Sequence, residues 1–178
     1  VLGAATVLEA TGTASVNIGG NITTNNGATT IDFTGAGSAV NLDGGAVQTI
    51  ASATAGVHGQ LSFLDLNVDG DVTVEQSLTV EDEFTVDIGG ALTLADAATQ
   101  VVVTLGTNAA AGSLVVDGIF NSGTMSVSAS DPGAVHPRLA AADNTNLAVY
   151  AAFTFSGLVN IDGLEVDRSE EHTSALQS

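Results

Sequence analysis

The sequence predicts an all-β fold, a right-handed parallel β-helix (β-solenoid) with about 24 residues per coil. Three observations support this prediction. A five-residue motif recurs six times, short apolar-x-apolar triplets lie between its copies, and the composition is rich in Gly and β-branched residues. The 178 residues are 44% hydrophobic but only 4% aromatic and include 21 Gly, which favours short strands of Val, Leu and Ile joined by tight turns.

The recurring motif reads apolar, any residue, apolar, Gly or Asp, Gly. Successive copies start 24, 26, 20, 28 and 45 residues apart, and the last spacing is close to two periods. Alternation sends the first and third residues to the same side of a strand, and the Asp-Gly or Gly-Gly pair supplies the backbone angles of a sharp turn. The copies begin at Val16, Val40, Leu66, Val86, Leu114 and Val159.

Further apolar triplets begin at Val72, Leu78, Phe84, Leu92 and Met125. Strands of three to five residues that turn every six to eight residues leave no room for the crossover helices of a doubly wound sheet. They can form the sides of coils stacked about 4.8 Å apart, and parallel crossovers predict right-handed winding. An antiparallel β-sandwich is the alternative, because Thr-rich alternation with Gly turns suits it, but it does not explain the recurrence.

Outward positions of the motif form a predicted column. Asn side chains stacked along such a column can hydrogen-bond to one another, as in cross-β assemblies, although Asn is also common beside turns for other reasons. Thr73, Thr79 and Thr85 recur every six residues, which predicts positions on successive sides of a coil and not one flat Thr face. The predicted column consists of Asn17, Asn41, Asn67, Asp87, Val115 and Asn160.

We expect one solenoid unit over residues 1–167, about seven coils long, with an irregular insertion at about 131–146 that contains Pro132 and Pro137. Residues 168–178 resemble the translated read-through of a sequencing adapter, with Ala175 where the adapter would give Glu. This resemblance implies a non-native tail on a metagenomic gene fragment.

The charge balance limits the partners. Lys is absent, Arg occurs twice and Asp plus Glu number 20, which gives a formal net charge of −18. Nucleic acid and anionic membrane surfaces both require Lys and Arg, so we expect neither as a partner. No apolar run approaches the roughly 20 residues that span a bilayer, so we expect no membrane insertion by this segment. The absence of Cys excludes disulfides and thiolate chemistry.

Two segments resemble the repeats of a known group of proteins. The segment 64–74, with the triplets at Leu78 and Leu92, looks like the repeats of bacterial surface adhesins, and the segment 112–127 is similar to autotransporter and haemagglutinin-type passengers. The resemblance implies a structural or adhesive segment, a stalk or passenger, of a larger secreted or cell-surface bacterial protein. Its host or glycan ligand is unknown, and open coil ends imply end-to-end self-association. The complete absence of Lys departs from the usual pattern of these families.

Sequence motifs for catalysis are absent. No Gly-x-Ser-x-Gly, Gly-x-Gly-x-x-Gly or Walker-type loop occurs, and His58, His136 and His172 are far apart in sequence. We therefore assign no catalytic, cofactor-binding or metal-binding residue and expect no enzyme activity. The alternative is a fragment of a β-helical polysaccharide lyase or glycosidase. Lyases of that kind typically use Lys or Arg, of which only Arg138 is available here, and glycosidases use two carboxylates across a cleft.

One segment raises the question of calcium. Residues 65–71 read Asp-x-Asn-x-Asp-Gly-Asp, which matches the opening of an oxygen-ligand calcium loop. The match fails at the twelfth position, which is Gln76, with Glu75 one residue early. The simpler interpretation makes Asp65 and Asn67 outward residues of a strand whose inward residues are Leu64, Leu66 and Val68. We therefore expect no cofactor.

Overall fold

The computed structural model describes 17 strands, and none of the residues it describes is helical. Consequently no helix able to cross a membrane occurs among these residues. The described residues are 7–10, 12–25, 27, 29–54, 56–95, 99–107, 110–122, 137–141, 152–161 and 165–166.

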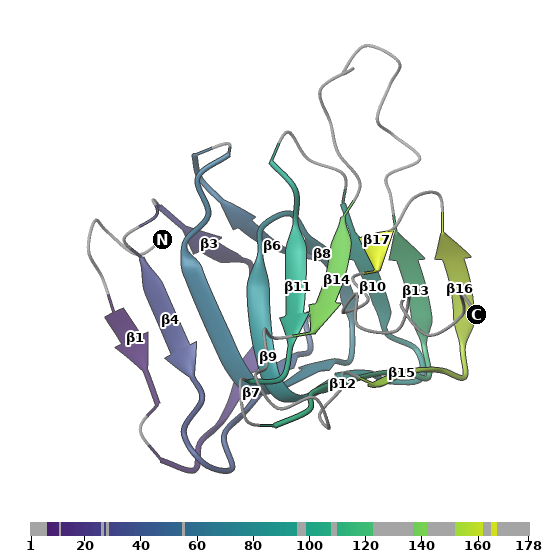
Figure 1. The fold of residues 1–178 in the computed structure, drawn as a ribbon, viewed down its shortest axis with the longest axis horizontal. Helices are drawn as coiled ribbons and strands as arrows, with labels where there is room; N and C mark the ends of the chain where they lie inside the picture. Colours follow the sequence, from purple (N-terminus) through teal and green to yellow (C-terminus); the bar gives the residue numbers. More distant parts are fainter. Residues whose placement is uncertain are drawn as a thin grey trace, which may run out of the picture.

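The chain visits three stacks of strands in turn, which we call faces 1, 2 and 3 (Figure 1). Face 1 contains β2 (Ser15–Ile18), β5 (Ala39–Leu42), the second parts of β7 (Gln60–Val68) and β9 (Leu78–Val86), β12 (Ser113–Val116) and β15 (Ala152–Phe155). Face 2 contains β3 (Ile22–Thr24), β6 (Gln48–Ser52), β8 (Asp71–Val74), β10 (Ala91–Leu94), β13 (Ile119–Ser122) and β16 (Leu158–Ile161). Face 3 contains β1 (Val7–Glu9), β4 (Thr30–Phe33), the first parts of β7 and β9, β11 (Val102–Leu105), β14 (Arg138–Ala141) and β17 (Glu165–Val166).

Every pairing between the described strands is parallel. The predicted all-β class with parallel sheets is therefore confirmed, and the arrangement is compatible with a β-solenoid. The antiparallel sandwich is wrong for the described strands, because its hairpins would require antiparallel neighbours. Stacked partners lie 18 residues apart at Asp65 and Glu83, 24 at Asn17 and Asn41, and 39 at Asn121 and Asn160, so the spacing varies along the stack.

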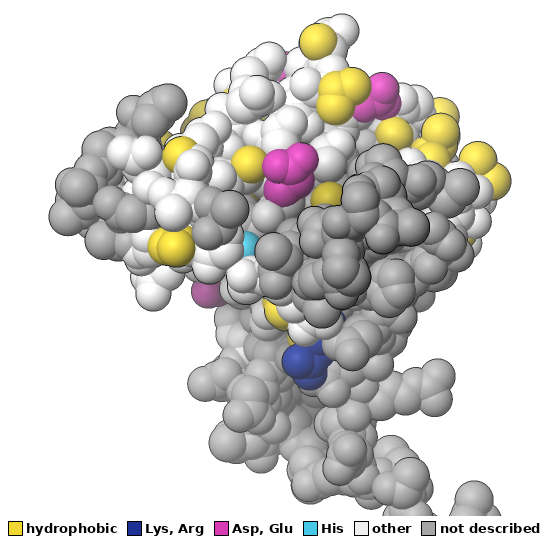
Figure 2. Space-filling model, turned by 90° about the horizontal axis from the view of Figure 1, so that it is seen from above, with side chains coloured by type: hydrophobic (Ala, Val, Ile, Leu, Met, Phe, Trp, Pro, Cys, Tyr) yellow, Lys and Arg dark blue, Asp and Glu magenta, His cyan; other side chains and the backbone are white. Residues whose placement is uncertain are grey.

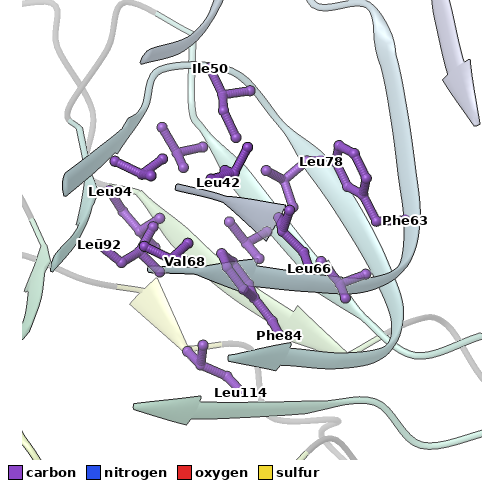
Figure 3. Close-up of a cluster of buried hydrophobic side chains, with 14 of the residues drawn as sticks. Leu42, Ile50, Phe63, Leu66, Val68, Leu78, Phe84, Leu92, Leu94 and Leu114 are labelled. Atoms are coloured by element: carbon purple, nitrogen blue, oxygen red, sulfur yellow. The ribbon is translucent and has the colours of Figure 1, made fainter. Parts of the chain in front are cut away.

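The core lies between the three faces. Alternation along each strand sends every second side chain inward, and those side chains form one buried cluster of Val, Leu, Ile and Phe. Figure 3 shows labelled members of this cluster converging from different strands, among them Leu66, Phe84 and Leu92. All three have no exposed surface. Burying such a side chain stabilises the fold by roughly 1.5–3 kcal/mol.

Two nine-residue strands, β7 and β9, pass from face 3 to face 1 without a loop. Their register shifts where they bend: Phe63 pairs with Val80 and Asp65 pairs with Glu83, so one residue of β7 faces two of β9. Such a β-bulge bends the paired strands. It leaves Leu64 half-buried, which differs from the fully inward position that alternation predicts.

The six motif copies do not all stack. Those at Val16, Val40, Leu66 and Leu114 share one inward column of face 1, with Phe84 between the last two. The copy at Val86 lies two residues out of register, because Asp87–Gly90 is a turn and not a strand. The copy at Val159 lies on face 2, where it pairs with Phe120. The prediction that all six copies stack in one column is wrong for these two copies. The same residue pattern occurs at more than one place in a coil, so the motif alone does not fix the register.

The turn from face 1 to face 2, which we call the Asp-Gly corner, is built from stacked backbones. It comprises residues 19–21, 43–47, 69–70, 87–90, 117–118 and 156–157. A Cβ atom on Gly70 would lie 2.7 Å from the carbonyl oxygen of Gly44, and one on Gly118 would overlap that of Gly90. In the motif copies that end at Gly70, Gly90 and Gly118, the Gly is therefore required by the close approach of the neighbouring backbone.

Within the predicted insertion at about 131–146, residues 138–141 form β14 and pair with β11. Residues 131–136, residues 142–146 and the tail 168–178 lie outside the described residues.

Candidate functional site

The calcium-like segment does not close around one point. Asp65 and Asn67 lie on face 1, Asp69 lies at the Asp-Gly corner, and Asp71 begins β8 on face 2. Leu66 and Val68 between them are fully buried, which confirms the strand interpretation at these positions. Within the described ranges no three His, Cys, Asp or Glu side chains form a group that could hold a metal ion.

His58 contacts a serine of the next coil. Its Nδ1 accepts a hydrogen bond from the backbone N–H of Ser77 at 3.2 Å and lies 3.1 Å from Ser77 Oγ. The same Ser77 Oγ accepts a hydrogen bond from the N–H of Val102 at 2.9 Å, one coil further. Partial burial lowers the pKa of His58, which favours the neutral ring that these hydrogen bonds require. These hydrogen bonds connect three successive coils, and we call this set of contacts the His58 clasp.

Of the other residues considered for catalysis, only Arg138 lies among the described residues. Arg138 lies on β14 of face 3, in register with Glu165. His136 and His172 lie outside the described residues.

An amide ladder runs along the outer side of face 1. Asn41 Nδ2 donates to Asn17 Oδ1 at 2.7 Å, and Asn67 Nδ2 donates to Asn41 Oδ1 at 2.8 Å. The predicted hydrogen bonding between stacked Asn side chains is thus confirmed for these three residues. Beyond Asn67 the column continues through Thr85, Val115 and Thr154.

Asn160 belongs to a second ladder, which corrects the prediction of one column. Its Nδ2 donates to Asn121 Oδ1 at 2.9 Å on face 2, and Asn121 Nδ2 donates to Thr93 Oγ1 at 3.2 Å. Thr73 and Thr49 continue this column in register. Asp87, which the prediction placed in the first column, lies instead at the Asp-Gly corner.

The predicted alternation of Thr side chains is confirmed. Thr73 lies on face 2, Thr79 on face 3 and Thr85 on face 1. The Thr column of face 2 was not predicted. Its signal is the central Thr of the triplets that begin at Val72 and Leu92, namely Thr73 and Thr93, and the register adds Thr49 to them.

In the middle of the stack, each coil has one Asp carboxylate at the start of its Asp-Gly corner. Leu42, Val68, Val86 and Val116 are stacked register partners, and each is followed by an Asp. A hydrogen bond with Asp87, partial desolvation and repulsion by Asp87 and Asp43 raise the pKa of Asp69. We call this set the acidic corner; its members are Asp43, Asp69, Asp87 and Asp117.

Two further carboxylates are perturbed. Burial raises the pKa of Asp65, with repulsion by Asp82 and Glu83, although the N–H of Glu83 donates to Asp65 Oδ1. Burial and repulsion by Asp32 raise the pKa of Glu81. These carboxylates are crowded by like charges, and no such crowding occurs along the two amide and hydroxyl ladders.

Exposed apolar side chains accompany face 2. Ile88 is 88% exposed in the Asp-Gly corner, and Leu158 is 57% exposed at the start of β16, where it pairs in register with the exposed Ile119. Figure 2 shows hydrophobic side chains along the upper right of the described surface. The surface therefore combines uncharged ladders, apolar side chains and an acidic corner.

Among the described residues the structure offers repeated outer columns of amide and hydroxyl side chains. Outer surfaces of this kind suit contact with other molecules or mechanical support. Comparisons with protein-family models, with curated proteins and with solved structures find no match to this chain.

Proposed function

We propose that this chain is a right-handed β-solenoid segment, averaging about 24 residues per coil, that serves as a stalk or adhesive passenger of a larger bacterial surface protein. The observation that supports it best is the stacking of short parallel strands along the longest axis of the molecule (Figure 1). Stacked repeats of this kind make extended, quasi-one-dimensional proteins whose sides serve as binding surfaces.

The outer ladders support an adhesive role on the same surface. Side-chain amides and hydroxyls recur along faces 1 and 2 at the spacing of parallel strands, about 4.8 Å. Such groups can donate and accept hydrogen bonds to a polar polymer such as a glycan. The formal charge of −18 disfavours anionic ligands, so a neutral glycan is the class of ligand we propose.

The adhesive role is tested by measuring how neutral glycans and cells bind to the immobilised chain. Binding should persist at high salt and should weaken when Thr73 and Thr93 are replaced by Lys. A matched double variant, Thr79→Lys with Thr104→Lys, alters face 3 and should bind as the parent does. Failure to bind any surface, together with rapid proteolysis, would contradict both the adhesive and the stalk role.

Assays for cleavage separate this proposal from the enzyme alternative. The chain should release neither unsaturated uronates nor new reducing ends from a panel of polysaccharides. Release of either product that depends on Arg138 would favour the lyase or glycosidase alternative.

A further inference from the structure

Two outward columns lie side by side on face 2. One is the hydroxyl and amide column described above, to which Thr93 and Asn121 belong. The other lies two residues nearer the Asp-Gly corner and is mostly apolar. In register order its members are Asp71, Ala91, Ile119 and Leu158. Parallel pairing places one member of each column about every 4.8 Å along the stack, so the two columns form neighbouring polar and apolar rows.

The apolar row is exposed in the interior of the stack. Ile119 is 38% exposed although its strand, β13, is paired on both sides, with β10 and with β16. It points outward because the next residue, Phe120, is fully buried. Ile88, in the turn that leads into β10, is 88% exposed. Contact with another molecule would remove this apolar surface from water, which folding of the chain does not do.

The part of face 2 that is formed by β10, β13 and β16 carries no charge among its described outward residues. These residues are Ala91, Thr93, Ile119, Asn121, Leu158 and Asn160. The adjoining strand β8 begins with Asp71 and is followed by Glu75. The amide ladder of face 1, in contrast, lies between Asp65 and Glu83 on one side and the acidic corner on the other. In a chain with a net charge of −18, this uncharged surface favours an uncharged ligand.

A ligand for this surface must present hydroxyl and apolar groups in neighbouring rows. Pyranose sugars do so, because hydroxyl groups surround the ring and C–H groups cover its faces. In β-linked polymers of glucose or N-acetylglucosamine the linkages are equatorial, so the chain is a flat ribbon with C–H faces and hydroxyl edges. In starch the α-linkage coils the same glucose units into a helix. Thr and Asn side chains can donate to and accept from the hydroxyl edge of such a ribbon.

We propose that the part of face 2 formed by β10, β13 and β16 binds a neutral, β-linked polysaccharide ribbon. The C–H faces of the sugar rings lie on the apolar row, and the hydroxyl edge lies on the row of Thr93 and Asn121. Each contact is weak, so binding requires a long or crystalline polymer that engages several coils at once. A second copy of the chain would bring its own charge of −18 to this surface and is disfavoured as the occupant. The inference rests on the proposed adhesive role and narrows its ligand to one class of glycan.

Cosedimentation of the full chain with cellulose and with starch granules tests the class of ligand, because both polymers consist of glucose and differ in linkage. Binding to cellulose should exceed binding to starch by about tenfold or more, at low and at high salt. Equal binding to both polymers would overturn the proposal. Binding to neither, while cells or other neutral glycans still bind, would overturn it and leave the adhesive role intact. Binding to no glycan and no cell would contradict both.

A double variant, Ile88→Ser with Ile119→Ser, tests the apolar row. Both side chains are exposed, so thermal unfolding should stay close to that of the parent, while cellulose binding should fall by about tenfold. The control, Val57→Ser with Val115→Ser, removes apolar side chains from the variable side of the coil and from face 1, and it should bind as the parent does. Equal loss in both variants would overturn the assignment to face 2. A parent oligomer that only the first variant dissociates would identify the surface as an interface between copies and would also overturn it.

Removal of charge from β8 provides a test by gain of binding. Asp71→Asn with Glu75→Gln joins the uncharged surface of β10 to Thr49 on β6, so a ribbon can contact more coils. Cellulose binding should rise by about threefold or more. The control, Asp82→Asn with Glu83→Gln, removes the same charge where β9 passes to face 1 and should leave binding unchanged. An equal rise in both variants would show that net charge and not face 2 governs binding, which would overturn the proposal.

Discussion

The Asp-Gly corner and the turn from face 2 to face 3 are held together in different ways. The Asp-Gly corner has two to five residues, and in the middle of the stack its backbones lie so close that Gly is required at Gly70, Gly90 and Gly118. The other turn, which we call the variable corner, includes the described residues 25, 27, 29, 53–54, 56–59, 75–77, 95 and 99–101, and the side chains of His58 and Ser77 contact each other there. The recurrence in the sequence therefore comes from backbone contact at the Asp-Gly corner. Coil length varies at the other turns, including the passage from face 3 to face 1, which has no loop within β7 and β9 but takes residues 106–112 between β11 and β12.

Two buried glutamines show the same contrast. Gln48, the first residue of β6 after the Asp-Gly corner, donates to the carbonyls of Ile18 and Gly20 at 2.6 and 2.8 Å and accepts from the N–H of Gly44 at 2.7 Å. Gln76, at the variable corner, accepts from Thr24 Oγ1 at 2.8 Å, but its Nε2 has no hydrogen-bond partner in the described structure. Both side chains are almost fully buried. The two glutamines are thus similarly buried, but Gln48 uses both of its polar atoms in hydrogen bonds whereas Gln76 uses only one.

The largest effect is expected in the shared core. Leu66→Asp places an unpaired carboxylate among fully buried side chains and should destabilise the chain by more than about 4 kcal/mol, enough to unfold it. Val115→Asp puts the same group on the outer side of the same face and should stay folded. Urea unfolding followed by circular dichroism measures both, and a native-like Leu66→Asp would refute its inward position.

Substitution of corner glycines comes next in size. Gly70→Ala brings a Cβ to 2.7 Å from a backbone carbonyl and should cost about 1–3 kcal/mol. Gly20, the equivalent residue of the first motif copy, has no atom within 4 Å of such a Cβ, so Gly20→Ala should change stability by less than about 0.5 kcal/mol. Equal unfolding midpoints for the two variants would remove backbone stacking as the reason for the motif.

The two glutamines provide a third comparison. Gln48→Met leaves two carbonyls and one N–H without their partner and should cost about 2–3 kcal/mol. Gln76→Met removes one hydrogen bond together with an unpaired donor, so it should cost about 1 kcal/mol or less. Thermal unfolding of the two variants side by side measures the difference, and the reverse order would contradict the hydrogen-bond assignment.

Much of the fold could be predicted from the sequence, because alternation and the Gly requirement act within a few residues. Leu66, Val68 and the Asp-Gly pairs follow directly from these rules. The position of Val159 could not be predicted, since register depends on the lengths of the turns between strands, and the motif does not fix these lengths. Gln48 was missed because a polar residue at an inward position reads as outward when its backbone partners are unknown.

The ladders of the candidate surface were predictable only in part. Asn17, Asn41 and Asn67 share a motif position, so their stacking was visible in the sequence. The contact between His58 and Ser77 joins loops of unequal length, and no local pattern indicates it.

The smallest expected effects are those of pH, and the two corners differ in sign. The pKa of Asp69 is raised in the folded state, so ionisation of this carboxyl destabilises the fold, and the destabilisation is smallest below the ordinary pKa of Asp. Stability from this group then decreases as the pH rises toward the raised value. Asp69→Asn should flatten this part of the stability profile between about pH 4 and pH 7, and an unchanged slope would contradict the crowding of the acidic corner.

His58 behaves in the opposite way. Its pKa is lowered in the folded state, so its contribution is complete above the ordinary pKa of His and is lost as the pH falls through the lowered value. His58→Asn should remove this loss in a thermal unfolding series from about pH 7 to pH 5. If parent and variant lost stability equally on acidification, protonation of His58 would not be the cause of the loss.

The stacking register is tested most directly by disulfide trapping, because the chain contains no Cys. Stacked partners in parallel strands lie about 4.8 Å apart, within the range that a disulfide spans. Asn121→Cys with Asn160→Cys pairs residues that are register partners on face 2, and this variant should cross-link readily on oxidation. Val115→Cys with Asn160→Cys pairs residues that the motif alone would stack but that lie on different faces, and it should not. Cross-linking of the second pair in place of the first would contradict the three-faced stack.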